Sequence, residues 1–166
     1  MILGMRWAWI SDPDLATGWE NFDVFSINCY AVDPTEAISH VVELGVDLPV
    51  MIGEFHFGAL DTGLSATGLE GVLPQKDRGK AYRYYCERVA AHPNGVGCHY
   101  FQCYDQFVLG RFDGENYNIG LFDICSRPYQ DMASYVKQCS EAMYEIADGT
   151  KVPTDEKAES IPMIAY

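Results

Sequence analysis

Glu54 is the residue whose type and position most clearly indicate chemistry. It follows residues 48–52, a short apolar stretch that is entered through a proline and closed by Gly53. That pattern is typical of a strand buried on both faces of a parallel sheet. A carboxylate at the end of such a strand is costly to desolvate unless a charged or hydrogen-bonding group lies beside it, which favours a functional site. The alternative is a structural glutamate held by backbone N–H groups or by an arginine.

Two histidines could join Glu54 in a site. In an extended chain His56 shares a face with Glu54, and His99 lies in a second predicted strand. A metal-dependent hydrolase using both histidines is therefore one hypothesis, but no HxxxH or CxxC spacing supports it. No GxGxxG follows a strand either, and residues 110–114 are too short and too acidic to cradle a phosphate. We therefore expect neither a metal nor a nucleotide cofactor.

Composition narrows the classes of partner. The chain of 166 residues has the length of one domain, and 48% hydrophobic residues suffice for a core. Its formal charge of −13 disfavours nucleic acid and anionic membranes. Abundant aromatic residues suit the stacking of flat ligand faces such as sugar rings, although most of them are expected to fill the core.

The N-terminal segment lacks a basic region, a long apolar segment and a cleavage site. As written it predicts neither a secreted precursor nor a membrane protein, but a fragment would have lost such a signal, so localisation stays open. The six cysteines have no CxxC spacing, and we predict that they are reduced, buried small hydrophobic residues. They are Cys29, Cys86, Cys98, Cys103, Cys125 and Cys139.

The predicted elements alternate between strands and helices. Strands are predicted over residues 2–10, 23–30, 48–52 and 96–102, with a polar turn over 11–14, and helices over 33–44, 77–91 and 129–146. Residues 15–21 are too short for a good helix. Two long loops, 56–71 and 103–120, are candidates for ligand contact. We expect one domain over 1–147, followed by an irregular surface arm over 148–166.

This alternation fits two architectures. One is an open doubly wound sheet, and the other is part of a (β/α)8 barrel. In a barrel the catalytic face is built from the carboxyl ends of the strands. The barrel is favoured because the polar residues gather at those ends, namely Asn28, Tyr30, Glu54, His56, His99 and Gln102.

Three motifs resemble the agarase-type β-glycosidases, which belong to a large clan of retaining (β/α)8 hydrolases that also contains β-galactosidases. They are Ile52-Gly-Glu-Phe-His-Phe-Gly-Ala-Leu-Asp61, His99-Tyr-Phe-Gln-Cys-Tyr-Asp-Gln106 and Gly110-Arg-Phe-Asp-Gly-Glu-Asn-Tyr-Asn-Ile-Gly120. The order of the strands also resembles that family from its fifth strand to its eighth. The resemblance implies an α/β fold that is the C-terminal half of a (β/α)8 TIM barrel.

The resemblance also implies roles for individual residues. Glu54 matches the nucleophile of the clan, and Tyr30 would hydrogen-bond it and hold it ionised. The substrate would be a β-linked galactan or another oligosaccharide. Sugar contacts are implied for Asn28, His56, His99 and Gln102, and a loop that floors the cleft for Asp105, Gln106, Arg111, Glu115 and Asn116. For Asp105 and Arg111 a salt bridge within the loop is an equal alternative.

One departure from the family limits the expected activity. Retaining hydrolysis needs a second carboxyl group about 5 Å from the nucleophile, and the clan places it on the fourth strand, commonly in an Asn-Glu pair. No Asn-Glu pair exists in this chain, and the only nearby candidates are Glu20 and Glu115. We therefore expect either half of a glycosidase or an inactive half-barrel that binds carbohydrate or assembles. Its open sheet edges predict a homo-oligomer or a partner N-terminal half-barrel.

Overall fold

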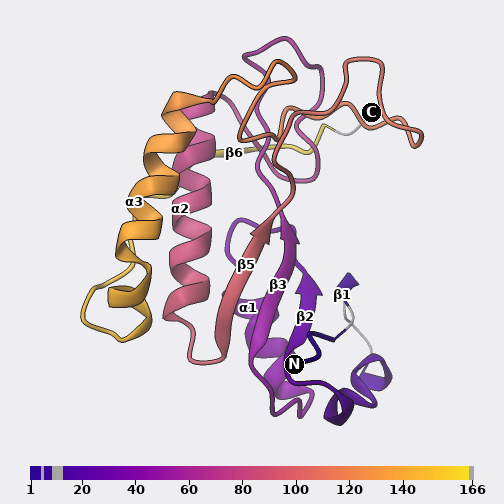
Figure 1. Cartoon of the computed structure of the whole chain (residues 1–166), viewed down its shortest axis with the longest axis vertical. Helices are drawn as coiled ribbons and strands as arrows, with labels where there is room; N and C mark the ends of the chain where they lie inside the picture. The colour runs from indigo at the N-terminus through magenta and orange to yellow at the C-terminus, as the bar shows by residue number, and fades with distance from the viewer. Residues whose placement is uncertain (5, 9–12, 165–166) are drawn as a thin grey trace.

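A four-stranded parallel sheet organises the described part of the chain. The computed structural model describes residues 1–4, 6–8 and 13–164. The sheet order is β1-β2-β3-β5, with β1 at Arg6–Ala8, β2 at Phe25–Asn28, β3 at Val50–Phe55 and β5 at Gly95–Tyr100 (Figure 1). The predicted α/β class with a parallel sheet is confirmed. Parts of the predicted first strand and of the turn after it, residues 5 and 9–12, lie outside the described residues.

The three α-helices begin and end within two residues of their predicted positions. They are α1 (Thr35–Glu43), α2 (Gln75–Ala91) and α3 (Gln130–Ala147). Asp33 accepts a 2.9 Å hydrogen bond from the Thr35 N–H at the start of α1, which satisfies a donor that the helix leaves unpaired. Residues 13–21 form only short 3₁₀ turns, η1 (Pro13–Ala16) and η2 (Trp19–Asn21). Among the described residues, no helix combines the length and apolarity that crossing a membrane requires.

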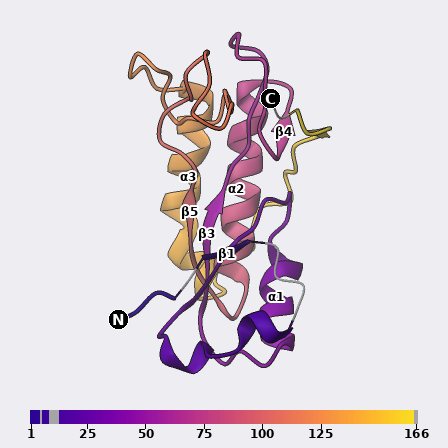
Figure 2. The same cartoon turned by 90° about the vertical axis from the view of Figure 1, so that its right-hand side faces the viewer.

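The hydrophobic core lies between one face of the sheet and the helices. Phe25 and Ile27 of β2 and Ile52 and Phe55 of β3 belong to the same buried cluster as side chains of all three helices. The Phe55 ring stacks on Tyr85 of α2 at 4.2 Å. Full burial of a side chain such as Phe55 contributes roughly 1.5–3 kcal/mol, so this layer fixes β3, the strand that carries Glu54. Figures 1 and 2 show α2 and α3 lying side by side.

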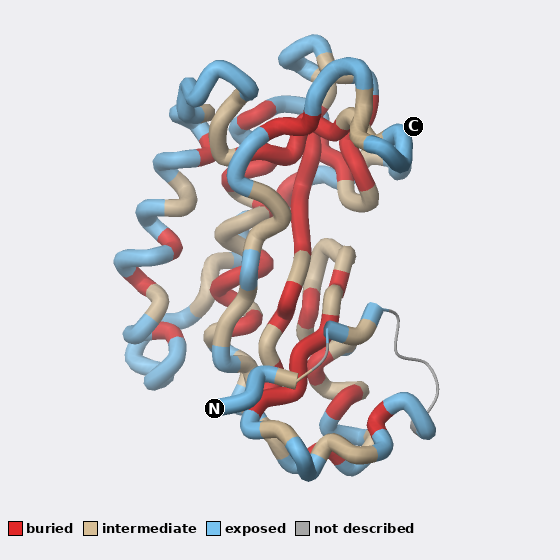
Figure 3. The backbone as a smooth tube through the Cα atoms, turned by 45° about the vertical axis from the view of Figure 1, so that its right-hand side comes forward, coloured by how far each residue is buried: buried red, intermediate tan, exposed pale blue. Residues whose placement is uncertain are grey.

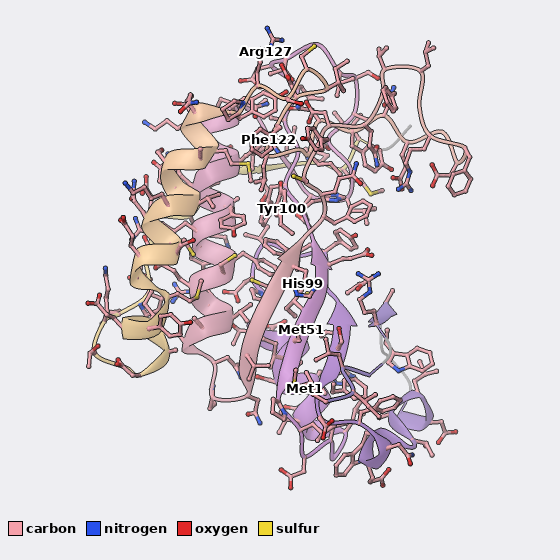
Figure 4. All side chains as sticks on the ribbon, in the orientation of Figure 1. Met1, Met51, His99, Tyr100, Phe122 and Arg127 are labelled. Atoms are coloured by element: carbon pink, nitrogen blue, oxygen red, sulfur yellow. The ribbon has the colours of Figure 1, made fainter. Side chains whose placement is uncertain are left out.

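The opposite face of the sheet is more open. Successive strand residues point to opposite faces, but the register of β3 against β2 shifts by one residue between Ile52 and Glu54. Met51 and Glu54 therefore lie on the same face, away from the helices, as do Arg6 and His99. Met51 and Glu54 are only half-buried, and Arg6 and His99 are exposed. The prediction that residues 48–52 are buried on both faces is therefore wrong, because the described helices pack on one face only. Figure 4 labels Met51 and His99 on β3 and β5, respectively.

The C-terminal segment is docked rather than loose. Its strand β6 (Ser160–Ile161) pairs antiparallel with β4 (Gly71–Val72), which lies at the end of the first long loop. The Thr154 N–H donates a 2.6 Å hydrogen bond to the buried carboxylate of Glu87 on α2. The irregular surface arm expected from residue 148 thus includes a short strand and contacts the helix layer. In Figure 3 the buried tube continues from β3 into residues 55–59, beneath exposed loops.

Candidate active site

Glu54 lies at the carboxyl end of β3 and is held by two side chains. Tyr30 donates a 2.7 Å hydrogen bond to its Oε2 atom, and Nη1 of Arg6 lies 3.2 Å from its Oε1 atom. The Glu54 side chain is 20% exposed and that of Arg6 is 51% exposed. An ion pair this open to solvent contributes only about 0–1 kcal/mol. The carboxylate is therefore accessible, and the arginine orients it without burying it.

Gly53 allows Arg6 to reach Glu54. A Cβ atom on Gly53 would lie 2.3 Å from Cδ of Arg6 and 2.9 Å from Oδ1 of Asn28. The arginine also donates a 3.2 Å hydrogen bond to the carbonyl oxygen of Gly53. The absence of a side chain at this position thus creates the path along which the guanidinium crosses from β1 to β3.

Tyr30 stays protonated and can act only as a neutral donor near neutral pH. Burial raises the pKa of its hydroxyl well above the ordinary value, and the hydrogen bond to Glu54 raises this pKa further. The charges of Glu54 and Glu115 act in the same direction, while Arg6 opposes them.

His56 is buried next to Tyr30 and accepts a hydrogen bond from the loop that follows β3. Its ring lies 4.7 Å from the Tyr30 ring, and its Nε2 atom accepts a 2.9 Å hydrogen bond from the Leu69 N–H. Burial, aided by the charge of Arg78, lowers the pKa of His56 to about 3, although a hydrogen bond to the Phe101 backbone opposes this. The neutral ring therefore carries its proton on Nδ1. The predicted sugar contact of His56 stays a prediction, because the contact at Nε2 is internal.

Arg78 ties the loops together above the sheet. It is completely buried, and its guanidinium donates to the carbonyl oxygens of Phe57 and Gly120 at 2.7 and 2.6 Å. It also donates to the side chain of Gln75 at 2.6 Å and to the Tyr100 hydroxyl at 3.2 Å. A buried charge is costly unless its donors are satisfied. Through these contacts Arg78 connects α2 to both long loops.

Asp105 also has an internal role. Its carboxylate accepts hydrogen bonds from Asn118, from the Gly120 N–H and from the Tyr129 hydroxyl. The pKa of Tyr129 is raised to about 12, first by burial and then by this hydrogen bond. Asp105 therefore fixes the base of the second loop. The alternative of a salt bridge within the loop is not what the structure has at Asp105, since the groups that donate to its carboxylate among the described residues are neutral.

Arg111 does form salt bridges within the second loop. Its guanidinium pairs with Asp113 and, at 2.8 Å, with Oε2 of Glu115. The same Oε2 atom accepts a 2.7 Å hydrogen bond from Gln106. The guanidinium lies over the Phe101 ring at 5.8 Å. The alternative of a salt bridge within the loop is therefore correct for Arg111. A sugar contact of Arg111 would have to use guanidinium N–H groups that do not take part in these salt bridges.

The other predicted sugar ligands are dispersed over the open face and the loops. Asn28 pairs with Glu54 in the β2–β3 register, and its buried Oδ1 atom has no hydrogen-bond partner among the described residues. Gln102 donates to the carbonyl oxygen of Tyr104 at 3.1 Å. Asn116 donates to Ser65 at 3.3 Å, which links the two long loops. His99 is exposed on β5, one residue before Tyr100 (Figure 4).

Two cavities open among these loops. One of about 360 Å³ is lined by Gln102, Tyr104, Asp105, Gln106, Phe107, Arg111 and Ile124. The other, of about 430 Å³, shares Asp105, Gln106 and Ile124 with it and adds residues that include Arg127 and Tyr129. Figure 4 labels Arg127 in the loop region beyond the end of the sheet. Amide, guanidinium and aromatic groups around a hollow suit the hydroxyl groups and faces of sugars.

The hypothesis of a metal site gains no support from the donor set. In the part of the chain that the structure describes, His, Cys, Asp and Glu side chains nowhere gather in a group of three or more that could hold a metal ion. His56 and His99 moreover differ in setting, since one is buried with Nε2 engaged and the other is exposed.

Comparisons with known proteins define the class as glycoside hydrolase-like. No family model matches the chain. The curated relatives are β-agarase B, 37% identical over 147 residues, and β-agarase A, 39% identical over 153 residues, both from Vibrio sp. (strain JT0107). Each alignment covers 87% of this chain but 15% of the relative. The chain is thus homologous to a segment of β-agarases and spans less than a sixth of these relatives.

Solved structures agree with this assignment. The crystal structure of an agarase superposes with a TM-score of 0.80 at 41% identity, covering 87% of this chain and 23% of that chain. An exo-β-agarase gives a TM-score of 0.80 at 37% identity, covering 90% and 20%. The β-glucuronidase of Faecalibacterium prausnitzii, at 20% identity and a TM-score of 0.58, is similar in fold alone. The resemblance to agarase-type glycosidases is confirmed, whereas the half-barrel stays a prediction.

Sequence reasoning missed several residues that build the site. The contact of Arg6 with Glu54 has only a weak signal in the sequence. The signal is Gly53, because a glycine before Glu54 is consistent both with the end of a strand and with space for a neighbouring side chain. Arg78 gave none, since an arginine near the start of a helix is ordinarily exposed. Asn118 and Tyr129, which hold Asp105, stood in segments that were interpreted only as loop and helix start.

Proposed function

We propose that this chain carries the nucleophile of a retaining glycoside hydrolase that acts on a β-linked galactan such as agar. The observation that carries the proposal is the Glu54 carboxylate at a strand end, 2.7 Å from the Tyr30 hydroxyl, in a chain homologous to β-agarases. The family resemblance extends the proposal to the fold, which would be the C-terminal half of a (β/α)8 barrel.

The proposed first step is attack by Glu54 on the anomeric carbon. An oxygen of the carboxylate forms a glycosyl ester while the bond to the leaving oxygen breaks, and water later hydrolyses the ester with net retention. Tyr30 supports this role because its neutral O–H stabilises the ionised carboxylate. Arg6 orients the other carboxylate oxygen and remains exposed enough to move when a sugar enters.

The acid/base carboxyl group is proposed to come from another polypeptide segment. Glu20 is exposed on a 3₁₀ turn. Glu115 is held by Arg111 and Gln106 within its own loop, so both of these contacts of its Oε2 atom would have to break before it could reach a leaving group. Neither residue therefore suits protonation of a leaving group.

Association would supply the missing part. In the described sheet, β1 and β5 are the two edge strands, and unpaired strand edges favour pairing with further strands. The proposed partner is an N-terminal half-barrel or a second copy of this chain. A single species at the monomer mass in solution, across micromolar concentrations, would argue against the second copy.

The proposed substrate groove runs from Glu54 towards the two loop cavities. Contacts to sugar hydroxyls are proposed for Asn28, His99, Gln102 and Arg111, and Asp105, Gln106, Glu115 and Asn116 would shape the wall. His56 would act from behind, through the Tyr30 ring. The cavity lining supports the assignments of Gln102, Asp105, Gln106 and Arg111. The other assignments rest on the family resemblance.

A burst experiment tests this function despite the missing acid. An aryl β-galactoside with a dinitrophenolate leaving group needs little protonation, so the first step can proceed without the acid. We expect a burst of about one dinitrophenolate per chain, followed by slow turnover, because no base activates water for the second step. The burst should vanish in Glu54→Gln and persist in Glu141→Gln, an exposed carboxylate on α3. A burst that survives Glu54→Gln would refute the proposal.

A second candidate function is a carbohydrate-binding or assembly module without turnover. The internal engagement of Glu115 favours it, because the described chain then offers no free second carboxyl group beside Glu54. Calorimetry with agarose oligosaccharides separates the two: binding without any burst supports the module. Loss of turnover on adding a chelator would instead revive the metal-dependent hydrolase.

A further inference from the structure

A groove lined by thiols runs along the free edge of the sheet, on the helix side and away from Glu54. It has a volume of about 450 Å³ and lies between β5, α2 and α3. Its walls include Tyr82, Val96 and Tyr144, together with Cys86 and Cys98. Val96 and Tyr144 are 57% and 87% exposed, so the groove is open to small molecules in this chain.

Two cysteines line this groove, and a third from another element lies next to one of them. Cys86 on α2 and Cys98 on β5 have their Sγ atoms 3.3 Å apart. Cys139 on α3 also interacts with the thiol of Cys86, which is thereby the central member. Cys86 and Cys139 are each 1% exposed, whereas Cys98 is half-buried. Nothing in the proposed glycosidase chemistry uses these thiols.

We propose that Cys86 and Cys98 form a redox-active dithiol, which low-molecular-weight disulfides convert to an intramolecular disulfide. A protein disulfide has its sulfur atoms about 2.05 Å apart, so the two sulfur atoms at 3.3 Å need to approach by little more than an ångström. The bond would join β5 to α2 and fix the sheet edge at which pairing with another strand is proposed.

The chemistry follows thiol–disulfide exchange in two steps. The Cys98 thiol loses its proton, and the thiolate attacks a disulfide R–S–S–R, forms the mixed disulfide Cys98–S–S–R and releases R–S⁻, which takes up a proton to become R–SH. The Cys86 thiol then loses its proton and attacks the Cys98 sulfur, which forms the Cys86–Cys98 bond and releases a second R–S⁻ that is protonated in the same way. The external disulfide is reduced to two thiols, and the dithiol is oxidised by the same two electrons.

Accessibility sets the order of the two thiols. Cys98 is the partly exposed member and reacts first, while burial raises the pKa of the Cys86 thiol and restricts it to the second step. The groove is largely apolar and the chain has a charge of −13, so a neutral aromatic disulfide should react faster than an anionic one.

The exposed cysteines must be removed before the test. Cys103 and Cys125 are exposed, contrary to the prediction that all six cysteines are buried, and they would react on their own. The background protein is therefore the Cys103→Ser/Cys125→Ser double variant. The probe is 4,4′-dithiodipyridine, a neutral aromatic disulfide whose product, 4-thiopyridone, is followed by its absorbance in the near ultraviolet.

We expect the double variant to release two thiopyridone molecules per chain and to keep no pyridyl adduct. Its intact mass should fall by two hydrogens, and a non-reducing peptide map should link Cys86 to Cys98. The melting temperature should rise by several degrees, because a short loop is closed covalently. Adding Cys86→Ser should change the result to one thiopyridone released and one pyridyl adduct retained on Cys98. Adding Cys139→Ser should change nothing.

Three results would overturn the proposal. One is a stable pyridyl adduct on Cys98 while Cys86 is present. Another is a peptide link through Cys139 in place of Cys98. The third is no release from the folded protein under conditions in which the urea-unfolded protein reacts. If Cys86→Ser fails to fold by circular dichroism, Cys86→Ala, which matches the small apolar character of a buried thiol, serves as the second variant.

Discussion

The hydroxyl of Tyr30, two residues beyond the end of β2, lies 2.7 Å from Oε2 of Glu54 on the neighbouring strand β3. Because burial and the neighbouring carboxylate raise the pKa of Tyr30, this hydrogen bond always presents a donor to the carboxylate near neutral pH. The hydrogen bond therefore orients the carboxylate of Glu54, as an attacking nucleophile requires.

Tyr30→Phe should slow the reaction of Glu54 without unfolding the chain. A hydrogen bond to a charged group is worth about 1.5–3 kcal/mol, which corresponds to a loss of roughly tenfold to a hundredfold in rate. The measurement is the burst rate with the dinitrophenyl galactoside. Tyr144→Phe, at an exposed tyrosine of α3, is the matched control. An unchanged burst rate in Tyr30→Phe would mean that the hydrogen bond has no part in catalysis.

Arg78→Met should destabilise the fold strongly. Its removal takes the arginine donor from the carbonyl oxygen of Gly120 and from Oε1 of Gln75, while the Phe57 carbonyl oxygen keeps only the Tyr100 hydroxyl as a donor. Each buried group left unsatisfied costs about 1–3 kcal/mol. We expect a loss on the order of 3 kcal/mol in the free energy of unfolding, measured with urea. Arg127→Met, at an exposed arginine, should cost less than about 1 kcal/mol. Similar losses in the two variants would contradict the role assigned to Arg78.

His56 should make the protein less stable as the pH falls below neutrality. Its pKa is about 3 in the folded chain, against an ordinary value of 6.5. Above pH 6.5 both states hold a neutral ring, whereas between about 6.5 and 3 only the unfolded state binds the proton, so stability falls with falling pH. From pH 7 to pH 5 we expect a loss of about 2 kcal/mol from this residue.

Urea unfolding at the two pH values checks this expectation. His56→Gln keeps an acceptor for the Leu69 N–H but does not titrate, so its loss between pH 7 and pH 5 should be smaller than that of the original chain by about 2 kcal/mol. His92 has a pKa lowered by burial and contributes in the same direction in both proteins. If His56→Gln retains the full pH dependence, the assignment to His56 is wrong.

Glu87 should hold the C-terminal segment on α2. Its buried carboxylate accepts the Thr154 N–H at 2.6 Å and pairs with Arg83. Glu87→Gln weakens both contacts, so we expect faster amide exchange at Thr154 and faster proteolysis between residues 148 and 159. Glu141→Gln, an exposed change on the next helix, should leave both rates unaltered. Equal protection of Thr154 in both variants would show that other contacts dock the segment.

Much of the fold could be predicted because its signals are local. The predicted end of the first helix at residue 44 lies one residue beyond the last residue of α1, and Gly45 follows with a φ of +87°. The predicted start of α2 at residue 77 is two residues late, since the helix begins directly after Pro74. The β4–β6 pairing could not be predicted, since it joins two-residue segments about ninety positions apart whose side chains carry no alternating pattern. The open face of the sheet was missed for a similar reason. An apolar strand sequence indicates that the strand is buried. It does not indicate whether one face or both faces of the strand are covered by elements of the same chain.

The site was predictable where residue type and strand position coincide. Glu54 and Tyr30 meet as the family resemblance implied. The loop residues were harder to assign, because a polar side chain in a loop serves internal and external partners equally well. Asp105 and Gln106 hold their own loop, and no pattern in the sequence distinguishes that use from contact with a sugar.

Covalent trapping of Glu54 tests the central claim most directly. A 2-fluoro-galactosyl donor with a dinitrophenolate leaving group slows hydrolysis of the ester, so a nucleophile stays labelled. After incubation, intact mass and peptide mapping should show one fluorogalactosyl group per chain, attached to Glu54 and absent from Glu54→Gln. Label on a different carboxylate, or a folded chain that binds oligosaccharides yet never acquires label, would contradict the assignment of Glu54 as the nucleophile.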